Sequence, residues 1–204
     1  MFTLWFMGRP ASGKSTIASR VEDRLVDLGY PVENLDGDDI RRSLHPDLGF
    51  SRADRRTNNR RTAYIAKLLN RNGIPVIVGM ITPFRESQEQ ARDIIETEGE
   101  FVLVYVKCSL EEAERRDPKG LYAAARAGNI DQFTGVNHPF QSPLNPEVTV
   151  DTENTTVDQC VEKVVNTLFK REFANDVDGM YGFPIDQARE AEIVRFLRET
   201  DHLA

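Results

Sequence analysis

The sequence is poor in cysteine and contains no long apolar run. Its 204 residues include two cysteines, Cys108 and Cys160. Two are too few for a disulfide framework, and both stand in apolar patterns typical of buried free thiols. No stretch approaches the length of a transmembrane span. The opening residues, MFTLWFMG, lack the basic start and the long apolar segment of a signal peptide. We therefore expect a cytoplasmic protein without a membrane partner.

The sequence also lacks the excess of positive charge that general nucleic-acid binding requires. Its 26 lysines and arginines against 33 aspartates and glutamates give a formal net charge of −7. An acidic protein that handles anionic nucleotides must gather positive charge locally, and it is a poor candidate for binding nucleic acid. The length suits one domain with a full core.

The first stretch with a chemical signature is FMGRPASGKST, residues 6–16. It fits the pattern G-x-x-x-x-G-K-[ST], and it stands between a strand-like run at 2–7 and a helical pattern at 14–28. In such a loop, backbone N–H groups and the helix N-terminus surround phosphates, the lysine reaches the β- and γ-phosphates, and the next hydroxyl ligates Mg²⁺. An ordinary glycine-rich turn is the alternative, and the strand–loop–helix setting argues against it.

Strand-like apolar runs recur along the chain, with helical patterns between them. The runs span residues 2–7, 32–35, 75–81, 101–106 and 148–150. This alternation predicts an α/β protein with a parallel sheet and helices on both of its faces. Two short patterns, Ser109–Glu112 and Thr156–Gln159, predict capping boxes at helix starts. Residues 117–146 are rich in proline, glycine and polar residues, and long segments of this kind in compact domains are often lids.

Two aspartates follow the second expected strand, in LDGDDIRRSL. Asp36 and Asp38 should lie beside the phosphate loop, because the carboxyl ends of parallel strands share one edge of the sheet. Carboxylates at that place can orient a metal's waters or accept the proton of an acceptor hydroxyl. The alternative is an Asp-Gly turn with solvated acids.

Residues 47–69 are rich in arginine. On a helix, Arg55 falls three and four residues before Asn58 and Asn59, so one face could present guanidinium and amide groups to a second anion. A solvated basic face is the alternative, and we expect it for several of these arginines. In the lid segment, Lys119 and Arg126 could close over phosphoryl charge. Phe133 could stack on a base or simply pack under the loop.

Together these stretches resemble the adenylylsulfate kinases, which phosphorylate the 3′-hydroxyl of adenosine 5′-phosphosulfate. The matching stretches occur in family order over roughly residues 2–170 and read GRPASGKST, LDGDDIRRSL, DLGFSRADR, VIVGMITPFR, RDPKGLYAAARAG and FTGVNHPF. The resemblance implies a P-loop NTPase-like three-layer fold with a five-stranded parallel sheet. It also implies ATP as a substrate, Mg²⁺ as a cofactor and a homodimer.

The resemblance further implies a role for individual residues. Catalysis would rest on Lys14, Asp36, Asp38, Thr82 and Lys119. ATP would be bound by Gly8, Arg9, Pro10, Ala11, Ser12, Gly13, Lys14, Ser15, Thr16, Arg116 and Thr155. The acceptor would be bound by Asp38, Arg41, Phe50, Arg55, Asn58, Ile81, Thr82, Lys119 and Phe133. The metal would be held by Ser15 and Asp36. The kinase domain would cover residues 1–171, with a lid at about 117–146, and a helical extension would cover residues 172–204.

Several residues depart from the family pattern, and they leave the acceptor open. They are Arg9, Pro10, Asp39, Thr57, Thr82, Ala123 and Ala124. Asp39 adds negative charge and the two alanines stand in place of lysines, so binding of adenosine phosphosulfate could weaken or shift to a related nucleotide. The alternatives are therefore a kinase for another modified nucleotide and a non-catalytic nucleotide-binding module. The presence of Lys14, Ser15, Asp36 and Asp38 argues against the second.

Overall fold

The computed structural model describes residues 1–175 and residue 195. Its sheet has five parallel strands in the order β2-β3-β1-β4-β5. The strands are β1 (Phe2–Met7), β2 (Glu33–Asp36), β3 (Val76–Gly79), β4 (Glu100–Lys107) and β5 (Val148–Asp151). All five strands expected from the sequence are present, and the bounds of β1 are those expected.

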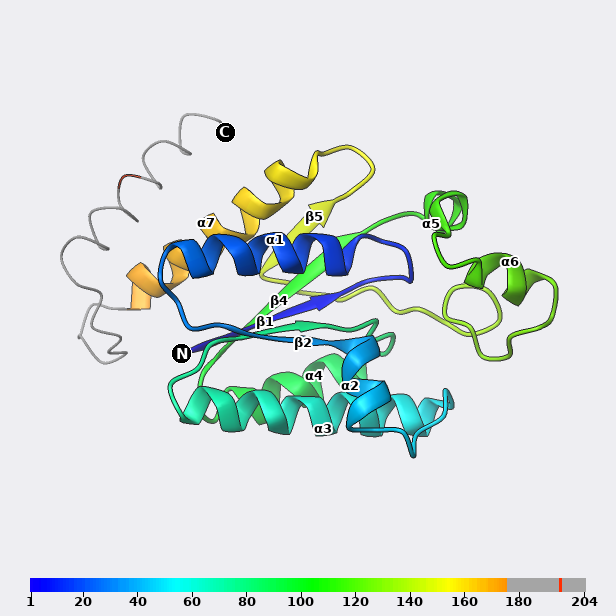
Figure 1. The fold of residues 1–204 in the computed structure, drawn as a ribbon, viewed down its shortest axis with the longest axis horizontal. Coiled ribbons are helices and arrows are strands. Elements are labelled where there is room, and N and C mark those ends of the chain that lie inside the picture. The colour runs from blue at the N-terminus through cyan, green and yellow to red at the C-terminus, as the bar shows by residue number, and fades with distance from the viewer. Residues whose placement is uncertain (176–194, 196–204) are drawn as a thin grey trace.

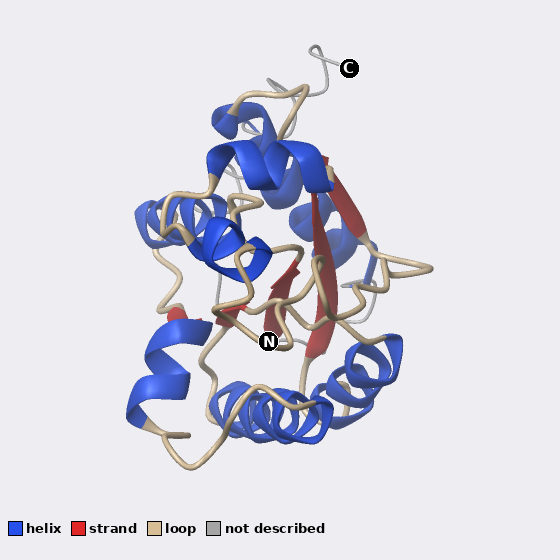
Figure 2. Cartoon of the chain, turned by 90° about the vertical axis from the view of Figure 1, so that its right-hand side faces the viewer, coloured by secondary structure: helices blue, strands red, loops and turns tan. Residues whose placement is uncertain are grey.

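Helices cover both faces of the sheet (Figure 1). They are α1 (Lys14–Asp27), α2 (Gly37–Ser43), α3 (Arg52–Arg71), α4 (Arg85–Ile95), α5 (Leu110–Arg116), α6 (Leu121–Arg126) and α7 (Val157–Asn175). Helices α1 and α7 pack on one face, and α3 and α4 pack together on the other. Figure 2 shows the strands between these two helical layers. The three-layer α/β fold predicted from the sequence is confirmed.

Strand β1 divides its side chains between the two cores because successive residues of a strand point to opposite faces. Phe2, Leu4 and Phe6 lie in the cluster beneath α1 and α7. Trp5 and Met7 lie in the cluster on the α3 and α4 side. The central strand is buried on both faces, as is usual in a parallel sheet, and its carboxyl end leads straight into the phosphate loop.

The two expected capping boxes differ in the structure. Thr156 and Gln159 form the reciprocal pair, in which each side chain accepts a hydrogen bond from the other residue's backbone N–H. Ser109 accepts from the backbone N–H of Glu112, but Glu153 instead of Glu112 accepts from the Ser109 N–H. Arg115 and Arg116 bind the Glu112 carboxylate and draw it away from the box.

The expected lid segment contains the short helix α6, and its Tyr122, Ala125 and Phe133 share a small apolar cluster with Cys108 and Ala113. Within residues 1–175, no helix is both long and apolar enough to cross a membrane. Both cysteines are free and buried, as expected. Helix α7 continues past residue 171, and the remainder of the expected C-terminal extension, residues 176–204, lies outside the described residues except for Arg195.

Candidate active site

A cavity of about 1080 Å³ opens at the carboxyl edge of the sheet. Its walls come from the phosphate loop, the β2–α2 junction, the start of α3, the turn after β3, the lid segment and the chain after β5. Most of the site residues expected from the sequence line it. The volume lies just above the roughly 300–1,000 Å³ usual for ligand pockets.

Two glycines of the phosphate loop have separate physical reasons to be glycine. A Cβ on Gly8 would lie 2.5 Å from the Val106 carbonyl oxygen and 2.8 Å from the Ser12 hydroxyl oxygen. Gly13, the N-cap of α1, has a φ of 93°, which side chains other than glycine rarely adopt. The loop therefore needs glycine at both positions for steric reasons alone.

Lys14 directs its ammonium group into this loop. The Nζ atom donates a hydrogen bond to the Arg9 carbonyl oxygen at 2.7 Å. Burial lowers the pKa of Lys14 to about 8, and the negative charges of Asp38 and Asp36 partly offset this effect. Because burial destabilises the charged ammonium group, a bound phosphate would stabilise it strongly.

Ser15 and Asp36 converge as the sequence predicted. The Ser15 hydroxyl donates to Asp36 Oδ2 at 3.2 Å. The other Asp36 oxygen caps α2 by accepting from the backbone N–H groups of Asp38 and Asp39. A hydroxyl and a carboxylate beside a phosphate loop are the hard oxygen donors that Mg²⁺ prefers, together with the substrate's phosphates. These residues fit the ion.

Asp38 and Lys119 bring α2 and the lid segment together across the cavity. Lys119 Nζ lies 2.6 Å from Asp38 Oδ2, and both side chains are largely exposed to the cavity and solvent. Hydrogen bonding to Asp38 and its negative charge raise the pKa of Lys119. Gly37, at the start of α2, lies close to the end of β3, since a Cβ there would lie 2.6 Å from the Gly79 carbonyl oxygen.

The arginines expected to bind the acceptor also organise the wall on which they stand. Arg41 donates to the Gly49 carbonyl oxygen at 2.6 Å, and its guanidinium lies 4.6 Å from the centre of the Phe50 ring. Arg55 is buried and donates to the Phe50 carbonyl oxygen at 2.9 Å and to the Gln132 carbonyl oxygen at 2.7 Å. Arg55 thus joins the start of α3 to the lid segment.

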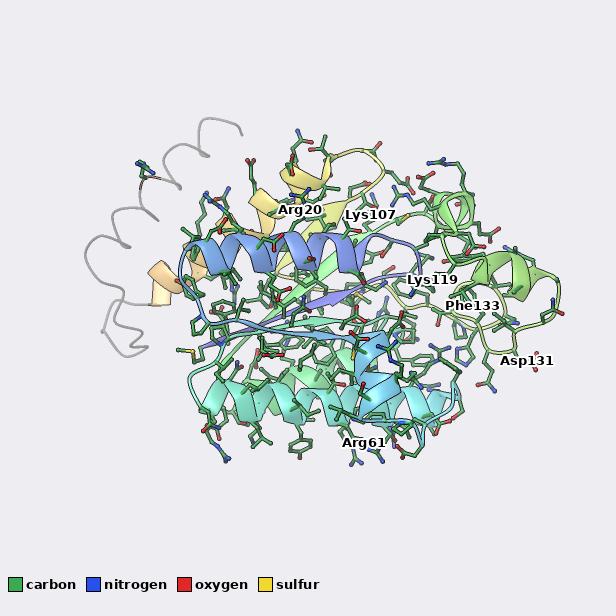
Figure 3. The ribbon with its side chains drawn as sticks, in the orientation of Figure 1. Arg20, Arg61, Lys107, Lys119, Asp131 and Phe133 are labelled. Carbon is green, nitrogen blue, oxygen red and sulfur yellow. The ribbon has the colours of Figure 1, made fainter. Side chains whose placement is uncertain are left out.

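Asn58 is buried beside Arg55 on α3, and its Oδ1 lies 2.7 Å from Nδ1 of His45. Both Arg55 and Asn58 line the cavity. By contrast, Arg61 lies on the outer side of α3 and is paired there with Asp47 (Figure 3). Only part of the arginine-rich stretch faces the cavity, in line with the expected mixture of binding and solvated arginines.

The two aromatic rings expected at the acceptor differ in exposure. Phe50 is 57% exposed, whereas Phe133 is 8% exposed. Phe133 packs edge-on against Tyr122, with ring centroids 4.9 Å apart, and Tyr122 donates to the Pro10 carbonyl oxygen at 3.1 Å. Phe133 therefore packs beneath the lid segment as well as lining the cavity. Figure 3 shows Phe133 and Lys119 together at this end of the molecule.

The other expected residues lie on both sides of the cavity. Arg116 donates to the side-chain and backbone oxygens of Thr152. Thr155 lines the same side and donates to the Asp151 carbonyl oxygen. Ile81 and Thr82 line the acceptor side. Pro10, Ala11, Gly13 and Thr16 line the cavity with Lys14 and Ser15, whereas Gly8, Arg9 and Ser12 support the loop from behind.

A sequence model of the family described as Adenylylsulphate kinase matches residues 1–151. The chain belongs to the adenylylsulphate kinase family. An adenylyl-sulfate kinase of Staphylococcus epidermidis is 45% identical to it over 170 residues, which make up 83% of this chain and 85% of that protein. The resemblance seen in the sequence is confirmed, and the chain is a member of a kinase family.

Solved structures give the same result. The Mycobacterium tuberculosis APS kinase CysC in complex with AMPPNP and APS is 42% identical, with a TM-score of 0.80 over 82% of this chain and 96% of that one. A hexameric APS kinase from Thiobacillus denitrificans is 29% identical, with a TM-score of 0.66 over 84% of this chain and 29% of that one.

Most departures from the adenylylsulphate kinase pattern lie away from the cavity. Asp39 is exposed and pairs with Arg42 on the surface of α2. Asp39, Thr57, Ala123 and Ala124 are all absent from the cavity lining, and among the departures only Pro10 and Thr82 belong to it. The positions at which charge departs from the family pattern therefore lie outside the cavity lining.

Sequence analysis missed two residues that join parts of the site. Thr152 donates to the Ser12 carbonyl oxygen at 3.1 Å, which links the chain after β5 to the phosphate loop. Its position just after the carboxyl end of a strand could have marked it. Tyr122, which ties α6 to Pro10, carries no comparable signal in the sequence.

Proposed function

We propose that the protein transfers the γ-phosphoryl group of ATP to the 3′-hydroxyl of adenosine 5′-phosphosulfate. The observation that carries this proposal is that the phosphate loop, the Asp38–Lys119 pair and the arginine wall of α3 line one cavity. The 42% identical APS kinase bound to AMPPNP and APS supports this pairing of ligands. Thr82 departs from the family pattern, whereas Lys14, Ser15, Asp36 and Asp38 are all present.

The proposed reaction uses Lys14 and Asp38 on opposite sides of the transferred group. Lys14 holds the β- and γ-phosphate oxygens. Ser15 and Asp36 would hold Mg²⁺, which would neutralise charge on the phosphates. The acceptor 3′-oxygen forms a bond to the γ-phosphorus while the bond from that phosphorus to the β,γ-bridging oxygen breaks. Asp38 accepts the proton of the 3′-hydroxyl, and ADP leaves.

Lys119 has a role that follows from its bond to Asp38. While the ammonium group holds Asp38 Oδ2, that oxygen is a poorer proton acceptor. An incoming phosphoryl group offers Lys119 a more highly charged partner. We propose that Lys119 moves from Asp38 to the transferred group, which frees the carboxylate at the moment when it is needed.

The acceptor lies, in this proposal, against the wall formed by Arg41, Phe50, Arg55 and Asn58. The exposed ring of Phe50 offers a stacking face for adenine. Arg41 and Arg55 place positive charge on that wall for the phosphosulfate end. Ile81 and Thr82 border the acceptor from the turn after β3.

The test is an acceptor panel with the purified full chain. ADP release is measured with ATP, Mg²⁺ and, in turn, adenosine 5′-phosphosulfate, AMP and other adenine nucleotides. We expect turnover with the phosphosulfate and formation of its 3′-phosphorylated product. Turnover with a different nucleotide only would identify another kinase, and ATP binding without turnover on any acceptor would identify a non-catalytic module.

We also propose that the protein is a cytoplasmic homodimer. The two free buried cysteines suit a reducing compartment. Tyr64 and Leu68, which are exposed one turn apart on α3, offer apolar surface for a second copy. Light scattering on the purified chain tests the assembly, and a monomer at all concentrations would exclude the dimer.

A further inference from the structure

The turn after β3 contains a residue in a costly backbone conformation. Thr82 has a φ of 42°, in the left-handed region that β-branched residues seldom enter. Such a conformation persists only where the surroundings hold it in place, and it is found mainly at functional sites. Ile81, Thr82 and Pro83 all line the cavity, so the turn lies where an acceptor would be bound.

Three segments hold this turn, and two of them are far from it in the sequence. Trp5 of β1 donates from its indole Nε1 to the Thr82 hydroxyl oxygen at 2.9 Å. Gln88 of α4 donates to the Thr82 carbonyl oxygen at 3.2 Å. The backbone N–H of Gln141, late in the lid segment, donates to the Pro83 carbonyl oxygen at 2.8 Å.

The bonds from Trp5 and Gln88 are both buried, and the one from Trp5 differs because it holds the Thr82 side chain instead of the backbone. Trp5 and Thr82 are 0% and 1% exposed. A buried indole N–H needs an acceptor, and the Thr82 hydroxyl supplies it. The hydrogen bond to Trp5 therefore favours one orientation of the Thr82 side chain. That orientation stabilises the left-handed backbone of Thr82.

We propose that Trp5 is a positioning residue for the acceptor nucleotide. Its indole N–H fixes the Thr82 hydroxyl and thereby sets the turn of residues 81–83 that borders the acceptor, while the ATP phosphates rest on a separate loop. The inference rests on the proposed function. Because Trp5 is the single tryptophan of the chain, its fluorescence reports on the same turn.

The kinetic test compares Trp5→Phe with the natural protein, varying each nucleotide in turn. Phenylalanine keeps an aromatic six-membered ring but removes the N–H donor together with part of the buried indole volume. We expect the KM for adenosine phosphosulfate to rise by about three- to tenfold, the range for one lost hydrogen bond, with little change in the KM for ATP. Phe101→Leu is the matched control, since Phe101 packs against Trp5 in the same core but lies outside the cavity lining.

A second pair of variants tests the same bond from the other side and does not depend on how Trp5→Phe folds. Thr82→Val keeps the β-branched shape and loses the acceptor oxygen, whereas Thr82→Ser keeps that oxygen. We expect Thr82→Val to reproduce the selective rise in KM, and Thr82→Ser, which keeps the bond from Trp5, to raise that KM less than Thr82→Val does. The double variant Trp5→Phe with Thr82→Val should be no worse than either single variant, because both remove one bond.

Fluorescence supplies a readout that a purely structural role would not move. Adenosine phosphosulfate should change the Trp5 emission of the natural protein more than ADP does, and Thr82→Val should abolish that difference. Equal rises in both KM values, or the same loss in Phe101→Leu, would overturn the positioning role. If the natural protein does not use adenosine phosphosulfate at all, the proposed function fails. If it does and the selective effect is absent, only this inference fails.

Discussion

The two sides of the cavity are built in opposite ways. The ATP side is one continuous loop between β1 and α1, shaped by the backbone at Gly8 and Gly13. The acceptor side is assembled from the start of α3, the turn after β3 and the lid segment, which are far apart in the sequence. Side-chain bonds such as those of Arg55 hold these pieces together.

This difference has a functional consequence. A backbone loop that binds phosphates by N–H groups and a single lysine tolerates little change and recognises a group common to all nucleoside triphosphates. In a wall made of side chains from several segments, a single substitution can alter one contact and leave the others in place. We therefore expect loss of activity from changes on the ATP side and altered selectivity from changes on the acceptor side.

The largest effect should come from Lys14→Ala. Removal of one electrostatic group of this kind lowers kcat by about 10²–10³-fold, and the fold should remain because Lys14 bonds only to the nearby Arg9 carbonyl oxygen. Steady-state kinetics and circular dichroism measure the two effects. Arg20→Ala is the matched control, since Arg20 is exposed on the same helix. Near-normal turnover in Lys14→Ala would contradict the phosphate-loop assignment.

Asp38→Asn should lower kcat by about 10²-fold, the lower end for loss of a general base, and should change the KM for ATP far less. An amide keeps the shape of the side chain but cannot accept the proton. Asp39→Asn provides the control, because the neighbouring carboxylate is exposed and outside the cavity lining. If Asp38→Asn alters only the affinity for ATP, Asp38 is a binding residue.

Phe50→Ala and Phe133→Ala should separate stacking from packing. Loss of the exposed Phe50 ring should raise the KM for adenosine phosphosulfate by about tenfold, near the low end for one stacked base, without lowering the melting temperature. Phe133→Ala should raise that KM as well, but it should also destabilise the protein by about 3 kcal/mol. Thermal unfolding monitored beside kinetics distinguishes them, and a stable Phe133→Ala variant would contradict its packing role.

Arg55→Ala should raise the KM for adenosine phosphosulfate several-fold and leave the KM for ATP nearly unchanged. Arg55 lines the acceptor side and also fixes the Phe50 and Gln132 backbone, so both charge and shape are lost. Arg61→Ala on the outer side of α3 is the control and should match the natural protein. Equal loss of affinity for both nucleotides would mean that the two sites are not separate.

The smallest expected effect is on the pH dependence of ATP use. With its pKa lowered to about 8, Lys14 in the free protein is charged below that pH and becomes neutral above it. The kcat/KM for ATP, which reports ionisation of the free enzyme, should therefore fall as pH rises through about 8. Lys14→Arg should move the fall to higher pH, because guanidinium stays charged. A flat profile would contradict the ionisation of Lys14.

The same contrast governs what could be predicted from the sequence. Short-range residue spacing and the periodicity of apolar residues predict the phosphate loop, β1, α1 and the Ser15–Asp36 pair. The structure has all four as expected. The burial of Phe133 depends on Tyr122, and the left-handed backbone of Thr82 depends on Trp5, 77 residues away. Contacts between residues so far apart leave no pattern in the local sequence from which they could be predicted. Asp39 looked like a charge added to the site, yet Arg42 pairs with it on the surface.

Gln141 finally limits how far the lid segment can travel. Its backbone N–H bonds to Pro83, its carbonyl oxygen accepts from Gln88 and its side chain accepts from the Arg85 N–H. These three hydrogen bonds fix Gln141 to the turn after β3 and to α4. The expected lid at residues 117–146 therefore ends before Gln141, and the chain from Gln141 onward belongs structurally to the main body beside the sheet.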